Sequence, residues 1–266
     1  MIRNLTELYQ YRALLIALSM RELKARYRAS VLGFLWTFLN PTLNMFVYVL
    51  VFGMVMRSAV PNYAYYLFTG LLPWIFFSSS LLGGTSSISD RRDLLTKVRF
   101  PAQVLPATVV LTNLINFLLS LPLLLGLGLF FGVTPSWHIV FLVPVLIVQT
   151  FFTLALTYFF AALNVAFRDL QHIVGNLVQM MFFITPVLWD LKSVPAIGSM
   201  TKEQSQQFVM QVNPMASVIA SWRDIFYEQK VPDWKPLLTV AAISLVVMLI
   251  STWVFERRRE EFAELV

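Results

Sequence analysis

Four basic residues fall within nine positions of an otherwise apolar region, where residues 91–101 read RRDLLTKVRFP. Such basic side chains can attract an acidic surface, and the apolar side chains between them can transmit force once a partner buries them. The residues concerned are Arg91, Arg92, Leu94, Leu95, Lys97, Val98, Arg99 and Phe100. Two interpretations are open: a docking segment, or a solvated basic loop that only fixes the orientation of the chain in a membrane.

The rest of the chain offers little chemistry for an active site. It contains no cysteine and two histidines, and neither histidine has a carboxylate or thiol partner to complete a metal site. We therefore interpret His138 and His172 as membrane-interface residues and predict no catalytic, cofactor or metal site. The run SLLGGT at 80–85 lacks the lysine of a phosphate-binding loop and favours close helix packing. A membrane enzyme is disfavoured, and uphill transport would need energy from another polypeptide.

The composition is that of an integral membrane protein. Of 266 residues, 58% are hydrophobic and only 13% are charged, and the mean hydropathy is +0.71. Soluble domains carry about 25% charged residues. The chain has a net charge of +6. In a membrane protein such a basic excess is typical of cytoplasmic loops that face anionic lipid, so we expect membrane lipid and no nucleic acid as a partner.

Six apolar segments can each cross a bilayer, since about 20 apolar residues span a hydrocarbon core of about 30 Å. We predict an all-α membrane protein that forms a single domain over residues 1–266. The six predicted spans are residues 31–56, 63–87, 103–131, 138–163, 173–189 and 237–255. None of them contains Asp, Glu, Lys or Arg, whereas proton-coupled carriers and membrane enzymes normally retain such groups.

Residues 1–29 precede the first span. Their polar and apolar positions separate onto two faces at helical spacing, which predicts an amphipathic helix on the membrane surface. The chain is then expected to turn into the membrane at Gly33. The alternative is a frayed polar tail.

Residues 190–236 form a long connection before the last span. Thr201 and Gln204 fit a capping box, so a short helix is expected to start there. Asn213-Pro214 opens an apolar stretch that is too short to cross a bilayer. This stretch is either a re-entrant helix dipping into the membrane or an ordinary external helix.

The distribution of cations predicts the orientation. If both termini are cytoplasmic, 14 of the 20 Lys and Arg residues lie on the cytoplasmic side. The positive-inside rule favours this arrangement. The strip at 91–101 would then be cytoplasmic.

Several groups of residues, in order along the chain, form a recognisable pattern. They are RELKARYR at 21–28, SVLGFLW at 30–36 with Asn40-Pro41, DLLTKVRFP at 93–101 with Leu105-Pro106, Thr185-Pro186-Val187 with Trp189, and Asn213-Pro214 with Arg223. Together they resemble the permease subunits of type-2 ABC exporters, in the branch that exports O-antigen, capsular polysaccharide or teichoic acid.

The resemblance implies a homodimer of six-span subunits joined to two copies of a separate ABC ATPase, in the bacterial cytoplasmic (inner) membrane. The ATPase would hold ATP and Mg, and this chain would hold no cofactor. Residues 90–101 would form a coupling helix docked on the ATPase. Residues 1–29 would form the interface helix, and residues 190–236 would include re-entrant helices near the external exit.

The resemblance also implies a lipid-linked polysaccharide as the substrate. Arg26 and Arg28 are expected to meet the diphosphate of the lipid carrier, because guanidinium groups pair with phosphate. Aromatic rings suit sliding contacts with sugars. The candidates for a glycan channel are Trp36, Tyr48, Tyr63, Tyr65, Tyr66, Trp74 and Trp189. Because most aromatics in membrane proteins face lipid or sit in interfacial belts, each has that second interpretation.

Two alternative functions stay open. The chain could serve an exporter of a drug or lipid, in which case small hydrophobic compounds would stimulate the ATPase. It could also be a passive channel or a membrane scaffold, and neither of these needs an ATPase partner.

Overall fold

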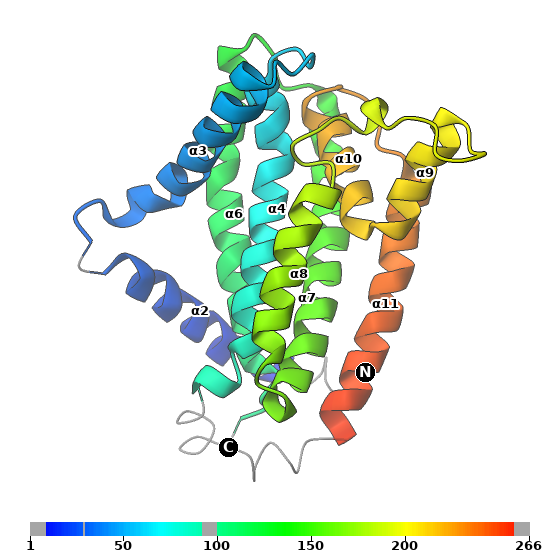
Figure 1. The fold of residues 1–266 in the computed structure, drawn as a ribbon. Coiled ribbons are helices and arrows are strands. Elements are labelled where there is room, and N and C mark those ends of the chain that lie inside the picture. The colour runs from blue at the N-terminus through cyan, green and yellow to red at the C-terminus, as the bar shows by residue number, and fades with distance from the viewer. Residues whose placement is uncertain (1–8, 29, 92–99, 258–266) are drawn as a thin grey trace.

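The computed structural model describes residues 9–28, 30–91 and 100–257, and this part of the chain is a bundle of helices without β-strands (Figure 1). The all-α prediction is therefore confirmed. The α-helices are α2 (Arg12–Tyr27), α3 (Trp36–Tyr48), α4 (Tyr63–Ser86), α6 (Val104–Phe130), α7 (Leu142–Ala166), α8 (Leu170–Ile184), α9 (Lys202–Val212), α10 (Pro214–Phe226) and α11 (Trp234–Arg257). Short helical turns are η1 (Gly33–Leu35), the π-helical η2 (Val49–Val55), η3 (Ser89–Arg91), η4 (Trp137–Phe141) and η5 (Leu191–Ser193).

Five helical segments of the described chain are long and apolar enough to cross a membrane. They are Gly33–Val55, Tyr63–Ser86, Val104–Phe130, Trp137–Ala166 and Trp234–Arg257. Each overlaps one of the six predicted spans. The remaining prediction corresponds to α8, an apolar helix of 15 residues. At 1.5 Å per residue α8 is about 22 Å long, which is shorter than the hydrocarbon core of a bilayer.

α8 ends at Ile184, before the end that the sequence predicted for this span. The reason is the proline at position 186, which disfavours the helical conformation for the residue before it. Thr185 accordingly has extended backbone angles, with φ −76° and ψ 137°. The chain after α8 therefore runs as irregular backbone to Trp189, and residues 185–188 are buried.

α4 is the central helix of the bundle and packs against α6, α7, α8 and α10. It is apolar around its whole circumference, which is typical of a helix buried on all sides. Gly84 permits the close approach of α7, because a Cβ atom there would overlap Cγ2 of Thr157. The predicted packing role of the small residues at 80–85 is thereby confirmed for Gly84.

α2 and α3 form an elbow at the side of the bundle (Figure 1). α2 packs against α6, and α3 slants away from the bundle toward the end where α2 lies. Gly33 starts η1 with a φ of +46°, a value that suits glycine. The turn predicted at Gly33 is thus present.

α9 and α10 cover the opposite end of the bundle (Figure 1). The capping box at Thr201 is formed: its hydroxyl accepts from the Gln204 amide, and the Gln204 side chain accepts from the Thr201 amide. Asn213 caps α10 by accepting from the Met215 amide at 3.1 Å. Both predicted helix starts are confirmed. We call the two ends of the bundle the α2 end and the α10 end.

Candidate functional site

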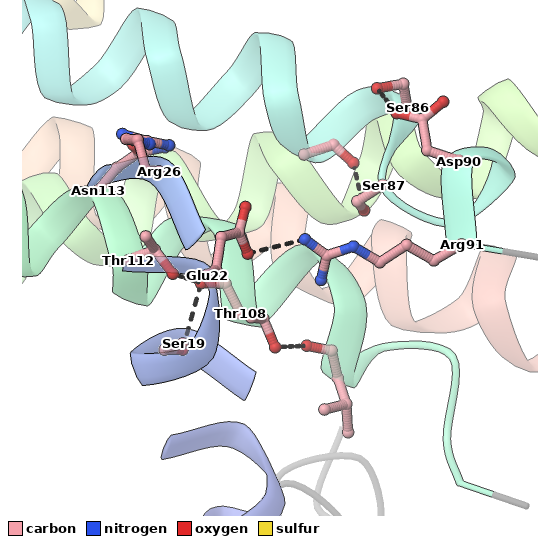
Figure 2. Close-up of polar contacts among 12 residues, drawn as sticks. Ser19, Glu22, Arg26, Ser86, Ser87, Asp90, Arg91, Thr108, Thr112 and Asn113 are labelled. Carbon is pink, nitrogen blue, oxygen red and sulfur yellow. Dashed lines mark hydrogen bonds and ion pairs between the residues drawn. The ribbon is translucent and has the colours of Figure 1, made fainter. Parts of the chain in front are cut away.

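The first residue of the basic strip, Arg91, is paired inside the subunit. Its Nη2 lies 2.7 Å from Oε2 of Glu22 on α2, and both side chains are about one quarter exposed. Figure 2 shows this ion pair crossing from η3 to α2, next to the contact between Ser19 and the carbonyl oxygen of Thr108 at 3.4 Å. The pair joins the start of the predicted coupling segment to the predicted interface helix.

The end of the strip also packs within the subunit. Phe100 is half-buried against a cluster of buried side chains that includes Ile88, Leu105 and Phe255. The other predicted docking residues lie outside the described part of the chain; they are Arg92, Leu94, Leu95, Lys97, Val98 and Arg99. Their docking role stays a prediction.

The two arginines predicted for the lipid head group have different surroundings. The Arg26 guanidinium reaches toward α6, where its Nη1 lies 3.4 Å from Oδ1 of Asn113. The side chain of Arg28 follows the end of α2 and is exposed. Arg26 is therefore the one that meets other polar groups of the bundle.

Arg26 lines a cavity of about 470 Å³ between α2, α3, α4 and α6. Its walls carry amides from two helices, namely Asn40 and Asn44 of α3 and Asn113 and Asn116 of α6. Trp36 also lines it, as do two phenylalanines and hydroxyl side chains of α3, α4 and α6. We call this cavity the amide groove.

The predicted channel aromatics on α4 lie in the core of the subunit. Tyr63, Tyr65, Tyr66 and Trp74 are all at least nine-tenths buried. The three hydroxyls donate to the backbone carbonyls of Leu188, Phe226 and Trp189, at 2.7, 2.8 and 3.2 Å respectively. The hydroxyl groups of the three tyrosines therefore bind backbone carbonyls of the same subunit. These hydrogen bonds stabilise the α10 end of the bundle.

The other predicted aromatics are more accessible. Trp36 is exposed at the amide groove, and its Nε1 donates to the Ser30 hydroxyl at 3.1 Å. Trp189 is half-buried and donates to the carbonyl of Phe183 at 2.9 Å. Tyr48 is half-buried and packs on Phe182, with 5.3 Å between ring centroids. Of the seven, Trp36 and Trp189 are the best placed to meet a substrate.

A buried arginine, Arg223 of α10, lies against α4. Its guanidinium carbon is 3.8 Å from the centroid of the Tyr66 ring, and its Nη2 donates to the Val187 carbonyl at 2.8 Å. Its Nε has no hydrogen-bond partner among the described residues. Gly70 provides the space, because a Cβ there would lie 3.1 Å from Nη2. Sequence reasoning placed Arg223 in the family pattern but assigned it no contact.

Together these bonds fix the 187–189 segment, the irregular backbone after α8. Its three successive carbonyls accept from Arg223, Tyr63 and Tyr66 in turn. Backbone polar groups at membrane depth need such partners because lipid supplies none. The 187–189 segment is therefore held to α4 and α10 at each residue.

A charged cavity of about 240 Å³ lies beside the 187–189 segment and is lined by Tyr66, Asp190 and Arg223 among others. On its rim, the hydrogen bond from Lys192 to Glu228, 2.7 Å long, raises the pKa of the Lys192 ammonium above its usual value. Pairing of this kind neutralises most of the rim. The cavity therefore has charges of both signs and no large excess of either that would select one class of ion.

A polar stripe follows the exposed face of α8. It consists of His172, Asn176 and Gln179, at positions i, i+4 and i+7, which share one face of a helix. The opposite face carries buried Val174, Val178 and Phe182. The stripe thus turns away from the subunit core. This stripe was not predicted from the sequence, because it contains no Asp, Glu, Lys or Arg. The helical spacing of its three residues is nevertheless visible in the sequence.

A metal site is not formed by the described residues: no group of three or more His, Asp or Glu gathers within residues 9–28, 30–91 and 100–257. Two polar surfaces on apolar helices remain: the amide groove, which includes the cation Arg26, and the α8 stripe. Amides at membrane depth need water, another chain or a polar ligand beside them. The arrangement suits a permeation pathway for a polar solute.

These features define a membrane-embedded transport subunit, and the chain belongs to the ABC-2 type transporter family, which residues 13–227 match. It is thus a multi-pass membrane protein and the membrane subunit of a transporter. It is 58% identical, over 99% of both chains, to the O-antigen export system permease protein RfbA of Myxococcus xanthus. It is also 32% identical, over 95% of both chains, to a protein of the same name from Klebsiella pneumoniae. The polysialic acid transport protein KpsM of Escherichia coli is 23% identical over 92% of this chain and 93% of its own.

Proposed function

We propose that this chain is the channel-forming subunit of an ATP-driven exporter that moves a lipid-linked polysaccharide from the cytoplasm to the outer side of the inner membrane. The α8 stripe is the observation that most directly supports this proposal. Amide groups exchange hydrogen bonds with hydroxyls without holding a charge, so a sugar polymer can pass Asn176 and Gln179 without tight binding. The names of the full-length relatives support a polysaccharide as the solute.

A second copy of the chain completes the pathway in this proposal. The α8 stripe and the apolar side of α3 and η2 are both uncovered in a single subunit, as the exposed Phe46 and Val47 of α3 and Met54 of η2 illustrate. Two copies that face each other through α3 and α8 would shield the apolar side chains and enclose the stripe. The homodimer and its two ATPase subunits, which bind ATP and Mg, are part of the proposal.

The α2 end is proposed to face the cytoplasm. The segments predicted to be cytoplasmic contain 14 of the 20 Lys and Arg residues, and the positive-inside rule favours that side for them. In this orientation Arg26 and Arg28 are proposed to meet the lipid diphosphate, and the strip at 90–101 is proposed to dock on the cytoplasmic ATPase.

Export is tested in a strain that lacks the chain. We expect lipid-linked glycan to accumulate on the cytoplasmic side and surface glycan to be lost, and both to be restored by the wild-type chain. Asn176→Leu with Gln179→Leu should not restore surface glycan, because two amides are replaced by apolar groups of similar size. Normal surface glycan in the deletion strain would remove the proposal.

Docking is tested on the strip itself. Leu95→Asp should reduce co-purification of the ATPase and its stimulated hydrolysis, because a charge then replaces an apolar contact. Thr96→Asp is the matched control, since it adds the same charge without removing an apolar side chain. Phe100→Asp is less informative because Phe100 packs against the subunit core. An unchanged complex with Leu95→Asp would argue for a solvated topological loop.

A further inference from the structure

The amide groove contains more hydrogen-bonding capacity than an apolar helix bundle needs. Asn40 and Asn44 are four residues apart on α3, and Asn113 and Asn116 are three apart on α6, so each pair shares a helix face. Asn40 and Asn44 are exposed on a segment that is long and apolar enough to cross a membrane. Each amide offers two N–H donors and one oxygen acceptor. Lipid tails satisfy none of these groups on the exposed Asn40 and Asn44, so a polar occupant is expected beside them.

The groove presents three kinds of chemical group, namely a cation, amides and an aromatic ring. At the α2 end, the Arg26 guanidinium is exposed and makes one long contact to Asn113, which leaves donors for an anion. Beyond it are the amides, and Trp36 provides an aromatic surface. A cation suits phosphate, amides suit ring hydroxyls and N-acetyl groups, and an aromatic face suits the C–H face of a sugar.

The size and position of the groove fit a head group. Its volume of about 470 Å³ is within the range of roughly 300–1,000 Å³ that small-molecule sites occupy. It lies between α2 and α3, which meet at the elbow and diverge from there toward the bundle (Figure 1). A lipid whose tail stays in the bilayer can therefore insert its head group between the two helices.

We propose that the amide groove binds the diphosphate and the first sugar of the lipid carrier, and so selects the reducing end of the exported polymer. This inference rests on the proposed function, because it assumes that a lipid-linked glycan is the substrate. Arg26 holds the phosphate, and the α3 amides recognise the sugar. A phospholipid supplies a phosphate but no ring hydroxyls, so it would leave the α3 amides unsatisfied.

The test measures binding to the purified full-length chain in nanodiscs. One probe is a short-chain polyprenyl diphosphate that carries one N-acetylhexosamine, and the second is the same diphosphate without the sugar. Asn40→Leu with Asn44→Leu should weaken binding of the first probe about tenfold, the effect of losing two modest hydrogen bonds. Binding of the second probe should change by less than about twofold, because those amides do not meet the phosphate.

Two controls separate the contributions. Arg26→Gln should weaken both probes, and Gln207→Leu, an amide-to-leucine substitution at an exposed position of α9, should weaken neither. Phosphatidylglycerol should compete with the first probe poorly. Equal loss of both probes in the α3 variant, no loss of either, or equal competition by phosphatidylglycerol would overturn the proposal. A shift from dimer to monomer with unchanged binding would assign the amides to the second copy instead.

The same variants distinguish failure of this inference from failure of the proposed function. If Asn176→Leu with Gln179→Leu abolishes export while the α3 variant binds both probes normally, the export function stands and the groove is not the head-group site. If neither probe binds the wild-type chain and the deletion strain exports glycan normally, the proposed function itself fails.

Discussion

The bond from Tyr63 to the 187–189 segment can be removed without changing the shape of the core. The phenol oxygen of Tyr63 lies 2.7 Å from the carbonyl oxygen of Leu188, and both residues are buried. Tyr63→Phe removes only the donor, so it leaves a buried carbonyl without its partner. Such a loss costs about 1–3 kcal/mol. Since each 1.4 kcal/mol is a factor of ten, local opening of the segment should increase roughly 5- to 150-fold.

The measurement exploits the absence of cysteine from the chain. A single Val187→Cys substitution places a thiol at a fully buried position of the 187–189 segment. A maleimide then reacts only when the segment opens, and the labelling rate follows the opening equilibrium when closing is fast. We expect Tyr63→Phe to accelerate labelling in this background.

The control is Tyr65→Phe. The hydroxyl of Tyr65 donates to the carbonyl of Phe226 in α10 at 2.8 Å and not to the 187–189 segment. This variant loses the same kind of bond elsewhere, so it should lower overall thermal stability without specifically accelerating labelling at position 187. Equal acceleration in both variants would refute the view that Tyr63 holds the segment locally.

Two further predictions concern packing and charge. Gly84→Leu should destabilise the purified subunit by about 1–3 kcal/mol because its side chain collides with Thr157 of α7, whereas Gly126→Leu meets open space and should be nearly neutral in thermal unfolding. Reversing either Glu22 or Arg91 should lower the melting temperature, and reversing both should restore it. The coupling energy from that double-mutant cycle should be about 0.2–1 kcal/mol, since the pair is one quarter exposed, and a value of zero would contradict the proposed link between η3 and α2.

The positions of the membrane segments could be predicted from the sequence because length and hydropathy depend only on local composition. The same is true of local signals: the glycine at 33, the capping box at Thr201 and the cap at Asn213 all act within a few residues. The end of α8 was also readable, since Pro186 disfavours helix at Thr185. The prediction nevertheless extended this span to Trp189, because the apolar run continues to that residue.

The site could be predicted only in part because its contacts are not local. Tyr66 and Arg223 lie far apart in the sequence, and nothing in either neighbourhood specifies that they meet. α4 is apolar on every side, so its pattern predicts burial but does not reveal which partner each tyrosine hydroxyl has. The amide groove likewise combines asparagines from α3 and α6, each of which looks like an isolated polar residue in its own helix.

The shortness of α8 has a consequence for the biosynthesis of the chain. A helix of 15 residues that carries a histidine, an asparagine and glutamines gains little from entering lipid alone. α7 precedes it by a connection of only three residues, 167–169. We therefore expect the insertion machinery to accept α8 only as a hairpin with α7, and the topology of everything downstream of Ile184 to depend on that single joint event.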